Sequence, residues 1–472
     1  MVEGRSHKPV IDDSACRTCN VCVSGCPAEY IPEYRKEEQS LRGALYSGQR
    51  AKACGKEKMS LPPCRVACPI DLGTRDYVRL IAERKFLEAV DLIREELPFP
   101  GIIGRICHHP CEEACLRAKN LDEGVSLCAL KRFVADYEVG KREIPVIEPG
   151  ARKGALVAVV GGGPSGMACA LALRRAGYGV TIFEGSDRLG GMLYWGVPAY
   201  RLPRDVIERE VSIVEKAGIE VRYSTMVGKD ISLKEMREAF DAVYIGCGAQ
   251  AGAMVGLEKE TAKGVVSGVE FLRRANEHRP EPVAGRVLVV GGGNVAVDAA
   301  LTAKRVGAKE VRLVCLEKRA QMPASEWEVE QCRQEGIKIE NGWGPKSIIA
   351  EKERVTAVEF KRCTAVFDRE GCFNPSYSEG VTKRFDADRV IIAVGQAPQA
   401  AFLTELEGLE ITEGGWIKAD GETFETSLAG IFAGGDIVTG PAMAIEAISA
   451  GKRAAVSIDR YLSTCMDKAS AG

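Results

Sequence analysis

The sequence predicts an α/β protein in which two Rossmann-type domains follow a cysteine-rich, mainly helical front. Two stretches, residues 156–191 and 285–319, each read as an apolar strand, a glycine turn, a helix, a second strand and an acidic residue. The cysteines are unevenly placed, because 11 of the 18 lie within the first 128 residues. A chain of 472 residues allows roughly two to four domains with buried cores.

The first stretch, VAVVGGGPSGMACALALRRAGYGVTIFEGSDRLGG, carries the Gly-x-Gly-x-x-Gly spacing of a dinucleotide site. Gly161 makes the tight turn, Gly163 lets the backbone approach a pyrophosphate, and Gly166 lets the helix pack closely on the strand. The free amides at the helix start then face the phosphates. Glu184 ends the second strand, where a carboxylate can accept a hydrogen bond from a ribose hydroxyl. The expected contacts of this first site are Gly161, Gly163, Pro164, Ser165, Gly166 and Glu184.

The second stretch, GRVLVVGGGNVAVDAALTAKRVGAKEVRLVCLEKR, repeats this order with a looser glycine pattern. Its third glycine is replaced by Val297. The strand expected over residues 311–316 is followed by Glu317, in the position that Glu184 has in the first copy. Two such sites on one chain imply two nucleotides. The expected contacts of the second site are Gly292, Gly293, Asn294, Glu317, Lys318 and Arg319.

Two further segments assign FAD to the first site. The run RLGGM follows Glu184 at residues 188–192, and TSLAGIFAGGD ends at Asp436. Because FAD is longer than a nicotinamide dinucleotide, it needs a second contact, and Asp436 can give one to the ribityl chain or a phosphate. The alternative role of Asp436 is an N-cap for a helix over residues 442–454. These segments add Arg188, Gly191, Met192, Gly435, Asp436 and Ala444 to the expected FAD contacts.

The second site has no such closing segment, which suits a nicotinamide dinucleotide that must bind and leave. Hydride transfer between the two cofactors needs stacking and orientation more than proton transfer. We therefore name no catalytic acid or base on this chain.

The composition excludes several classes of protein. The formal net charge is -2 and the pI about 6.3, so the chain has no basic field for nucleic acid. No apolar run reaches the length of a membrane span, and the first residues contain no hydrophobic signal region. We therefore expect a cytoplasmic protein whose clustered cysteines bind metal, rather than the disulfide scaffold of a secreted domain.

The first cysteine group has the spacing of a bacterial ferredoxin [4Fe-4S] run. It reads Cys-x-x-Cys-x-x-Cys-x-x-x-Cys-Pro. Zinc is the alternative, but zinc sites usually pair two Cys-x-x-Cys units. In such runs the fourth cysteine commonly serves a different cluster. The residues are Cys16, Cys19, Cys22 and Cys26.

A second cysteine group surrounds an amphipathic helix expected over about residues 75–97. The apolar stripe of that helix is interpreted as core. His108 and His109 could ligate metal, but cluster ligands are mainly cysteine, so we expect both to be turn or supporting residues. The candidate ligands of this group are Cys54, Cys64, Cys68, Cys107, Cys111, Cys115 and Cys128.

These features together resemble a known family. The run CHHPCEEAC at 107–115, LKRF at 130–133 and the flavin fingerprint resemble the small subunit of glutamate synthase, over about residues 54–465. The run is similar also to the front half of dihydropyrimidine dehydrogenase and to the large subunit of ferredoxin-NADP transhydrogenases. The resemblance implies a helical domain with two [4Fe-4S] clusters and a glutathione-reductase-like pair of domains for FAD and NAD(P)H.

The sequence departs from that family at one cluster. The family shows Cys-x-x-Cys shortly before the Cys-x-x-x-Cys-Pro, whereas here only Cys54 precedes Cys64. The cluster is either lost or completed by another thiolate, such as Cys26. Two or three clusters are therefore possible. The preferred ligands of the cluster nearest the flavin are Cys68, Cys107, Cys111 and Cys128.

A second departure concerns the nicotinamide nucleotide. NADPH-using relatives place arginines after the second strand, whereas this chain has Glu317 there. A carboxylate at this position binds the ribose hydroxyls of NADH and repels a 2'-phosphate, which predicts NADH. The alternative is that Lys318 and Arg319 still bind the phosphate of NADPH.

The expected domains follow from these motifs and from a Pro-containing linker over residues 140–153. Residues 1–40 form a ferredoxin-like arm and residues 41–145 a helical iron–sulfur domain. Residues 154–254 and 389–465 form the FAD domain, with a strand from 389 returning the chain to it. Residues 255–388 form the NAD(P)H domain.

The cofactors predict an electron-transfer function. NADH gives two electrons together and a cluster accepts one, so a flavin between them must divide the pair. Residues 151–472 contain no Cys-x-x-Cys or Cys-x-x-x-x-Cys, which argues against a disulfide reductase.

We expect a diaphorase-type subunit of a hetero-oligomeric complex that passes electrons between NADH and the clusters of a partner subunit or ferredoxin. An electron-bifurcating complex is one such setting. The alternatives are a glutamate synthase small subunit and a non-catalytic iron–sulfur scaffold or sensor.

Overall fold

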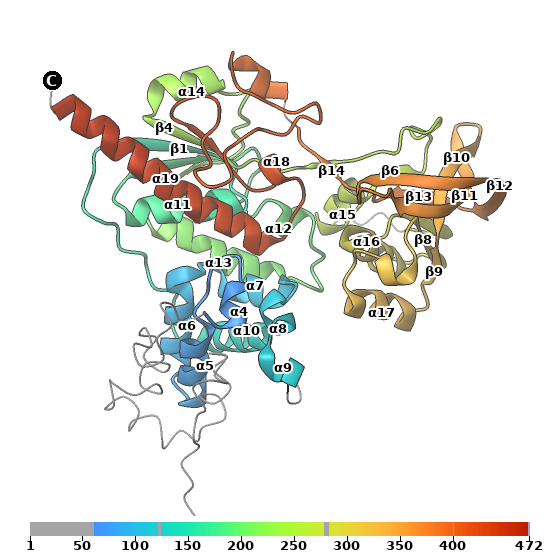
Figure 1. The fold of residues 1–472 in the computed structure, drawn as a ribbon, viewed down its shortest axis with the longest axis horizontal. Helices are drawn as coiled ribbons and strands as arrows, with labels where there is room; N and C mark the ends of the chain where they lie inside the picture. Colours follow the sequence, from blue (N-terminus) through green and yellow to red (C-terminus); the bar gives the residue numbers. More distant parts are fainter. Residues whose placement is uncertain (1–60, 121–123, 278–282, 400, 471–472) are drawn as a thin grey trace, which may run out of the picture. The chain divides into compact units, whose positions relative to one another are not determined.

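The computed structural model of the chain describes residues 61–120, 124–277, 283–399 and 401–470 (Figure 1). The chain divides into two compact units. One unit comprises Met1–Pro100 with His109–Glu138, and the other comprises Gly101–His108 with Val139–Gly472. In the described part of the chain, every strand belongs to the second unit.

The first unit is helical, and its main helices pack around one buried ion pair. Arg94 donates to both carboxylate oxygens of Glu138, at 3.0 and 2.8 Å. Both side chains are buried, which favours retention of this pair because either partner alone would be an unpaired buried charge. The helices are α4 (Pro63–Val66), α5 (Thr74–Ala82), α6 (Phe86–Glu96), α8 (Pro110–Glu113), α9 (Leu116–Asn120) and α10 (Leu127–Glu138).

The single helix expected over residues 75–97 is wrong, because the chain breaks it into α5 and α6. Arg84, between them, has a left-handed φ of 59°, and its backbone turns the chain. The apolar stripe continues across the break, so Tyr77 of α5 and Ile93 of α6 are both buried. Hydrophobic spacing alone does not reveal this turn, since neither glycine nor proline marks it.

The second unit begins with a five-stranded parallel sheet that forms the flavin lobe. Its strand order is β15-β4-β1-β2-β3. β1 occupies the expected position, and its residues from Val157 to Val160 are buried. The strands are β1 (Leu156–Val160), β2 (Gly179–Phe183), β3 (Glu220–Arg222), β4 (Ala242–Ile245) and β15 (Ile431–Ala433).

Helices surround this sheet, with α11 and α19 packed side by side (Figure 1). α19 is the longest helix, but no helix among the described residues has the length and apolarity to cross a bilayer. The helices of the lobe are α7 (Pro100–Ile106, in this unit from Gly101), α11 (Pro164–Arg175), α12 (Met192–Trp195), α13 (Arg204–Lys216), α14 (Leu233–Ala239), η4 (Ala401–Glu405), α18 (Asp436–Thr439) and α19 (Ala444–Ser470).

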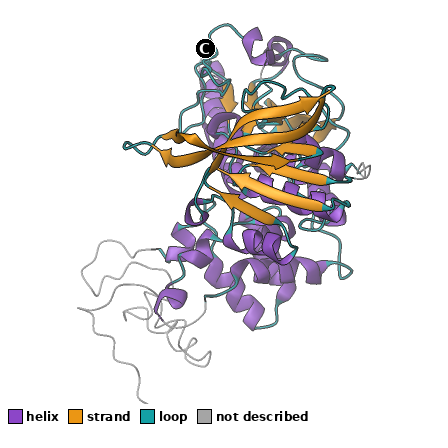
Figure 2. Ribbon diagram, turned by 90° about the vertical axis from the view of Figure 1, so that its right-hand side faces the viewer, coloured by secondary structure: helices purple, strands orange, loops and turns teal. Residues whose placement is uncertain are grey.

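A second parallel sheet, ordered β6-β13-β7-β8-β9, forms the nicotinamide lobe. Successive residues of each strand point to opposite faces of the sheet, so the sheet separates two hydrophobic cores. Val287 and Val289 of β7 pack with the helices α15, α16 and α17, whereas Leu288 and Val290 pack with a three-stranded antiparallel sheet (Figure 2). The elements are β6 (Val265–Ser267), α15 (Gly268–Asn276), β7 (Arg286–Val290), α16 (Asn294–Arg305), β8 (Glu310–Cys315), η3 (Arg319–Gln321), α17 (Glu326–Gln334), β9 (Lys338–Asn341), β10 (Trp343–Glu351), β11 (Arg354–Phe367), β12 (Phe373–Asp386) and β13 (Arg389–Ile392).

The two lobes are joined by a short antiparallel pair, β5 (Ala251–Gly252) with β14 (Gln396–Ala397). The sequence predicts that the strand beginning at Arg389 returns the chain to the flavin domain, but this prediction is wrong. This strand is β13, which pairs with β6 and β7 inside the second sheet. The chain crosses back only at β14. The apolar run of β13 suits either sheet, so its sequence could not decide between them.

Two glycines set the close packing of the first glycine turn. A Cβ on Gly166 would lie 1.9 Å from the carbonyl oxygen of Gly161, so only glycine lets α11 start this close to β1. A Cβ on Gly451 of α19 would lie 2.1 Å from the carbonyl oxygen of Ser165. α19 therefore packs directly on the first turn of α11.

We predict that Gly451→Ala destabilises the flavin lobe by about 1–3 kcal/mol and weakens FAD retention, because the added methyl meets backbone that cannot move aside locally. Thermal unfolding and the flavin-to-protein absorbance ratio measure both effects. The control is Gly421→Ala, where an added Cβ meets no atom within 4 Å. Wild-type unfolding and flavin content in the Gly451 variant would contradict the prediction.

Candidate functional site

A cavity in the second unit lies at the first glycine turn and contains most of the expected FAD contacts. Gly163 is the N-cap of α11, so the free amides of that helix face the cavity as an anion site requires. The lining includes the expected residues Gly161, Gly163, Pro164, Ser165, Glu184, Gly191, Met192, Asp436 and Ala444. This set of donors and small residues fits a flavin dinucleotide.

Glu184 connects the glycine turn to the end of β2. Its carboxylate accepts hydrogen bonds from the backbone N–H of Gly162 at 2.8 Å and from the backbone N–H and hydroxyl of Ser186 at 2.8 and 2.7 Å. The side chain is only 7% exposed, yet it lines the cavity. A carboxylate has further lone pairs, so Glu184 can hold the turn and still accept from a ribose hydroxyl.

Asp436 reaches the same cavity from the other end of the sequence. Burial raises the pKa of its carboxyl to about 6, and the backbone N–H of Ala442 partly opposes this by donating at 3.3 Å. Asp436 is the first residue of α18, and α19 starts only at Ala444. Asp436 therefore does not occupy the N-cap position of the longer helix.

Three expected FAD contacts do not line this cavity. Gly166 supports the turn from behind, as its contact with Gly161 shows, and Gly435 precedes α18 with a φ of 74°. Arg188 donates to Asp187 and, at 2.6 Å, to the hydroxyl of Tyr194. The assignment of these three residues to FAD, like that of the nine that line the cavity, stays a prediction.

The second glycine turn repeats the geometry of the first. A Cβ on Gly292 would lie 2.5 Å from a carboxylate oxygen of Glu317, and a Cβ on Gly162 would lie 3.0 Å from one of Glu184. Gly293 is the N-cap of α16. The residue in the place of Gly166 is therefore Ala296, three residues after the cap, and the assignment of that place to Val297 was wrong by one residue.

Of the expected contacts in the second site, Asn294 lines the cavity. Gly292, Gly293 and Glu317 surround the turn beside it. Lys318 precedes η3, and Arg319 pairs with Glu326 at the start of α17. The side chain of Arg319 is thus directed to a protein carboxylate here.

His108 lines the cavity, although no sequence pattern indicates a contact between this residue and the flavin. It lines the cavity together with Ile106, and its Nε2 meets the side-chain amide of Asn294. Asn294 in turn accepts from the backbone N–H of Ser325 at 3.0 Å. Cys107, an expected cluster ligand, stands between Ile106 and His108 in the chain. The spacing of the cysteines gave no signal that this segment reaches the nucleotide lobes.

A buried carboxylate anchors the helix that precedes Cys107. Glu210 of α13 accepts from the backbone N–H groups of Gly101 and Ile102, each at 2.8 Å. The side chain is 4% exposed. It therefore caps the N-terminus of α7 with a negative charge, where the helix dipole favours one.

In the first unit, several cysteines gather around the buried hydroxyl of Tyr77. Burial raises the pKa of Tyr77 strongly, and nearby thiols add to the shift; these are Cys111, Cys128, Cys64 and Cys68. Burial also raises the pKa of Cys68, while backbone N–H groups of Leu72 and Ile70 and the charge of Lys131 oppose it. Thiols with backbone donors to sulfur form the surroundings that an iron–sulfur cluster requires.

Cys115 has a different environment. Burial raises the pKa of this thiol, but hydrogen bonds from the backbone of Val125, Ala118 and Arg117 outweigh it, so the net pKa is lowered. A thiolate is therefore favoured at Cys115, as metal ligation requires. The side chain of Cys64 lies 3.1 Å from the hydroxyl of Thr74.

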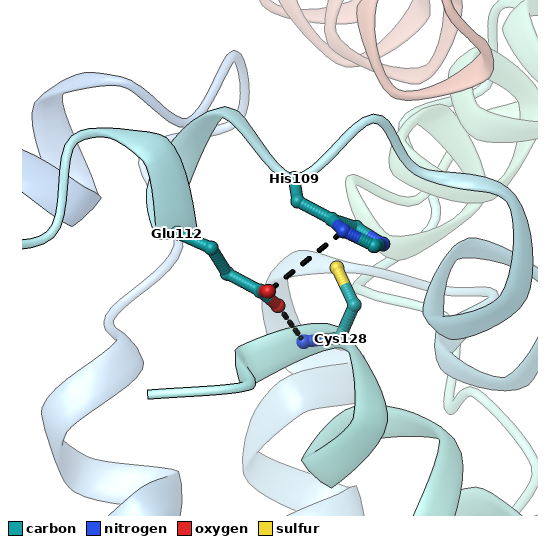
Figure 3. A group of neighbouring side chains, drawn as sticks. All are labelled: His109, Glu112 and Cys128. Atoms are coloured by element: carbon teal, nitrogen blue, oxygen red, sulfur yellow. Dashed lines mark hydrogen bonds and ion pairs between the residues drawn. The ribbon is translucent and has the colours of Figure 1, made fainter. Parts of the chain in front are cut away.

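His109 and Glu112 lie beside Cys128 (Figure 3). Glu112 accepts from the backbone N–H of Cys128 at 2.7 Å, and its other oxygen lies 3.7 Å from Nδ1 of His109. His109 has a left-handed φ of 62° directly before α8. His109 is thus a turn residue, and Glu112 fixes the backbone that carries the Cys128 thiol.

The remaining expected cluster ligands lie outside the described residues. These are Cys16, Cys19, Cys22, Cys26 and Cys54. The ferredoxin-like arm, the number of clusters and the cysteines that bind each cluster stay predictions.

Comparison with known sequences matches one family to the nucleotide lobes and another to the iron–sulfur part of the chain. The family described as pyridine nucleotide-disulphide oxidoreductase matches residues 155–451, and that described as dihydropyrimidine dehydrogenase domain II, 4Fe-4S cluster, matches residues 33–143. The NADPH-Fe(3+) oxidoreductase subunit beta of Geobacter sulfurreducens is 37% identical, over 98% of this chain and 74% of that protein. The glutamate synthase [NADPH] small chain of Escherichia coli is 31% identical, over 92% of this chain and 94% of that protein.

The chain belongs to the glutamate synthase small subunit-like FAD/NAD(P)H iron–sulfur oxidoreductases. It is an NAD(P)H-dependent flavin oxidoreductase. The NADP(+)-dependent formate dehydrogenase subunit beta of Moorella thermoacetica is 38% identical over 85% of this chain, and the match spans only 60% of that protein. Mycobacterium tuberculosis FprA has the same fold, with a TM-score of 0.58 and 18% identity over 67% of this chain and 86% of that one.

The sequence of the nucleotide lobes, residues 151–472, lacks the Cys-x-x-Cys and Cys-x-x-x-x-Cys pairs that the family name suggests. The cysteines of these lobes are isolated in the sequence, and the described ones are free thiols. Cys247 lines the flavin cavity, where burial raises its pKa to about 12. It therefore stays a neutral thiol that packs against the glycine turn.

We predict that Cys128→Ser lowers the iron content by about four atoms per chain, because it removes one thiolate of a [4Fe-4S] site. Iron analysis and low-temperature EPR measure the loss, and unchanged flavin content shows that the nucleotide lobes remain folded. Cys372→Ser, at an exposed free thiol, is the matched control. Full iron content and an unaltered EPR spectrum in the Cys128 variant would exclude Cys128 as a ligand.

Proposed function

We propose that this protein is a diaphorase-type electron-input subunit that passes electrons between NADH and iron–sulfur clusters. The observation that carries the proposal is the position of Cys107. This expected ligand is flanked by Ile106 and His108, which both line the flavin cavity. A cluster held by Cys107 would therefore have the shortest possible covalent connection to the cavity wall.

The residues of the chain bind and orient the cofactors in this proposal. Bound FAD supplies the conversion between two-electron and one-electron transfer. The N-terminus of α11, Glu184 and Asp436 would hold FAD, and the N-terminus of α16 with Asn294 would hold the nicotinamide dinucleotide. Glu210 would keep the Cys107 segment at the cavity.

The position of Glu317 supports NADH over NADPH. Its carboxylate lies against Gly292 as Glu184 lies against Gly162, in the place of a ribose-binding acid. Arg319 is already paired with Glu326. The relatives are named for different nucleotides. The Geobacter and Escherichia coli proteins above are named for NADPH, whereas the PreT subunit of Escherichia coli is named NAD-dependent. The proposed preference for NADH therefore rests on the negative charge of Glu317 and not on the names of the relatives.

The partner in this proposal is a redox protein subunit or a ferredoxin that accepts the electrons. Several relatives are named as subunits, among them the beta subunit of the Moorella formate dehydrogenase and the PreT subunit. A second candidate function is the small subunit of a glutamate synthase, which the match over 94% of the Escherichia coli small chain favours. Purification with a large amidotransferase chain would distinguish the second candidate.

An anaerobic titration tests the proposal. We expect NADH to bleach the flavin absorbance and then to produce cluster EPR signals, with NADPH much less effective because Glu317 repels a 2'-phosphate. Glu317→Arg is expected to raise the relative efficiency of NADPH by about 10- to 100-fold. The control is Glu330→Gln, which removes an exposed carboxylate of α17 that pairs with Arg333 and not with Arg319.

Each result has a definite meaning for this proposal. Preference of the wild-type protein for NADPH would show that Lys318 and Arg319 decide the nucleotide, and the assignment to Glu317 would be wrong. Flavin bleaching without cluster reduction would contradict the electron-input role. A flavin that neither nucleotide reduces would favour a scaffold or sensor.

A further inference from the structure

A buried arginine of the flavin lobe, Arg201, forms ion pairs with the nicotinamide lobe beside the cavity. Arg201 lies in the segment between α12 and α13, and its side chain is 11% exposed. It donates to Asp298 of α16 at 2.5 Å and pairs with Glu328 of α17 at 2.6 Å. The two carboxylates are 8% and 1% exposed. One cation from the flavin lobe thus holds two helices of the other lobe.

Neighbouring contacts connect the same two surfaces. Asn276 at the end of α15 donates to the carbonyl oxygens of Trp195 and Val197 in the flavin lobe, at 2.9 and 3.2 Å. The guanidinium of Arg305 lies 3.7 Å from the ring centre of Tyr200, beside Arg201 in the chain. Among these contacts, only the loss of Arg201 would remove the ion-pair partner of two buried carboxylates, Asp298 and Glu328.

Asp298 connects this contact to the nucleotide site. It lies four residues after Asn294, so both residues are on one face of α16. Arg201, Asn294 and Asp298 all line the cavity that contains the flavin fingerprint. The position of Arg201 therefore determines where the N-terminus of α16 lies relative to the flavin residues.

We propose that Arg201 is a positioning residue that, through Asp298 and Glu328, fixes the nicotinamide lobe at the orientation needed for hydride transfer to the flavin. The proposal rests on the nucleotide-dependent reduction of the flavin and not on the clusters or the partner. Small displacements of reacting groups have large effects on rate, so a residue that sets the distance between lobes acts on the rate of flavin reduction more than on nucleotide affinity.

The charges around the contact predict a pH dependence. Burial raises the pKa of Asp298 to about 6 and that of Glu328 to about 7, while Arg201 opposes both shifts. The other groups that face them are Tyr200, Arg305, Ser325 and Cys332. As pH rises through this window the acids ionise and attract Arg201 more strongly, so the rate of flavin reduction should rise. The same ionisation removes stability, because the folded-state pKa values exceed the ordinary ones of 3.8 and 4.5.

Stopped-flow reduction of the intact protein by NADH, followed at the flavin absorbance, tests the proposal. We expect Arg201→Met to lower the limiting rate of flavin reduction by about 10- to 100-fold, with a change of less than about threefold in the Kd of NADH. The long-wavelength charge-transfer band of the nicotinamide–flavin complex should also weaken. Arg201→Lys should restore part of the rate, and Asp298→Asn with Glu328→Gln should remove the rise between about pH 6 and 7.

The matched control is Arg286→Met, which breaks an exposed arginine pair with Asp388 in the same lobe and should leave rate and pH profile unchanged. An unaltered limiting rate in Arg201→Met would overturn the proposal, and so would a raised Kd with an unaltered rate, which would mean that Arg201 contacts the nucleotide directly. If Arg201→Met does not fold, the Asp298→Asn and Arg201→Lys variants decide by the same criteria. Failure of the electron-input function would give a different result: in the wild-type protein NADH would reduce the flavin, but the clusters would stay oxidised.

Discussion

The buried contact between Glu210 and the first amides of α7 holds the segment that leads from α7 to the cavity wall. The two hydrogen bonds of this carboxylate hold α7 on α13, and the chain leaving α7 supplies Ile106 and His108 to the cavity wall. A charged acceptor at a helix N-terminus makes a strong cap because it satisfies free amides and opposes the helix dipole. The cysteine between the two wall residues is thereby placed by a helix cap, and not by cofactor binding alone.

The two nucleotide lobes share one arrangement of a glycine turn, a helix and a carboxylate, but different segments pack against the two turns. Each has a glycine turn, a helix that begins at it and a carboxylate packed against the middle glycine. The flavin site is closed by Asp436 and by α19, whose Gly451 approaches the backbone of Ser165. The α16 turn is instead contacted by the residues before α17, where the backbone N–H of Ala324 donates to the carbonyl oxygen of Gly292 at 3.2 Å and that of Ser325 donates to Asn294 at 3.0 Å. In the proposed function FAD is retained and the nicotinamide dinucleotide exchanges, and Arg201 would then set the position of the lobe that binds the exchanging nucleotide.

Local patterns predicted the parts of the structure that depend on local chemistry. The strands, the glycine turns and the positions of Glu184 and Asp436 follow from spacing and from strand ends, which a sequence displays directly. The break at Arg84, the placement of β13 and the role of His108 do not. Each of these depends on tertiary packing: a non-glycine turn held by two helices, an apolar strand that suits either sheet, and a histidine brought to the cavity by α7. Arg201 has no sequence motif because its partners lie 97 and 127 residues away.

The most direct test of the proposed electron path is rapid-freeze EPR combined with flavin absorbance after mixing the anaerobic protein with NADH. We expect flavin absorbance to fall first and a reduced-cluster signal then to grow without further addition of reductant. A flavin that stays reduced while the cluster signal never appears would contradict the placement of Cys107 as the exit for electrons. A cluster signal that grows before the flavin is reduced would contradict the order of the cofactors.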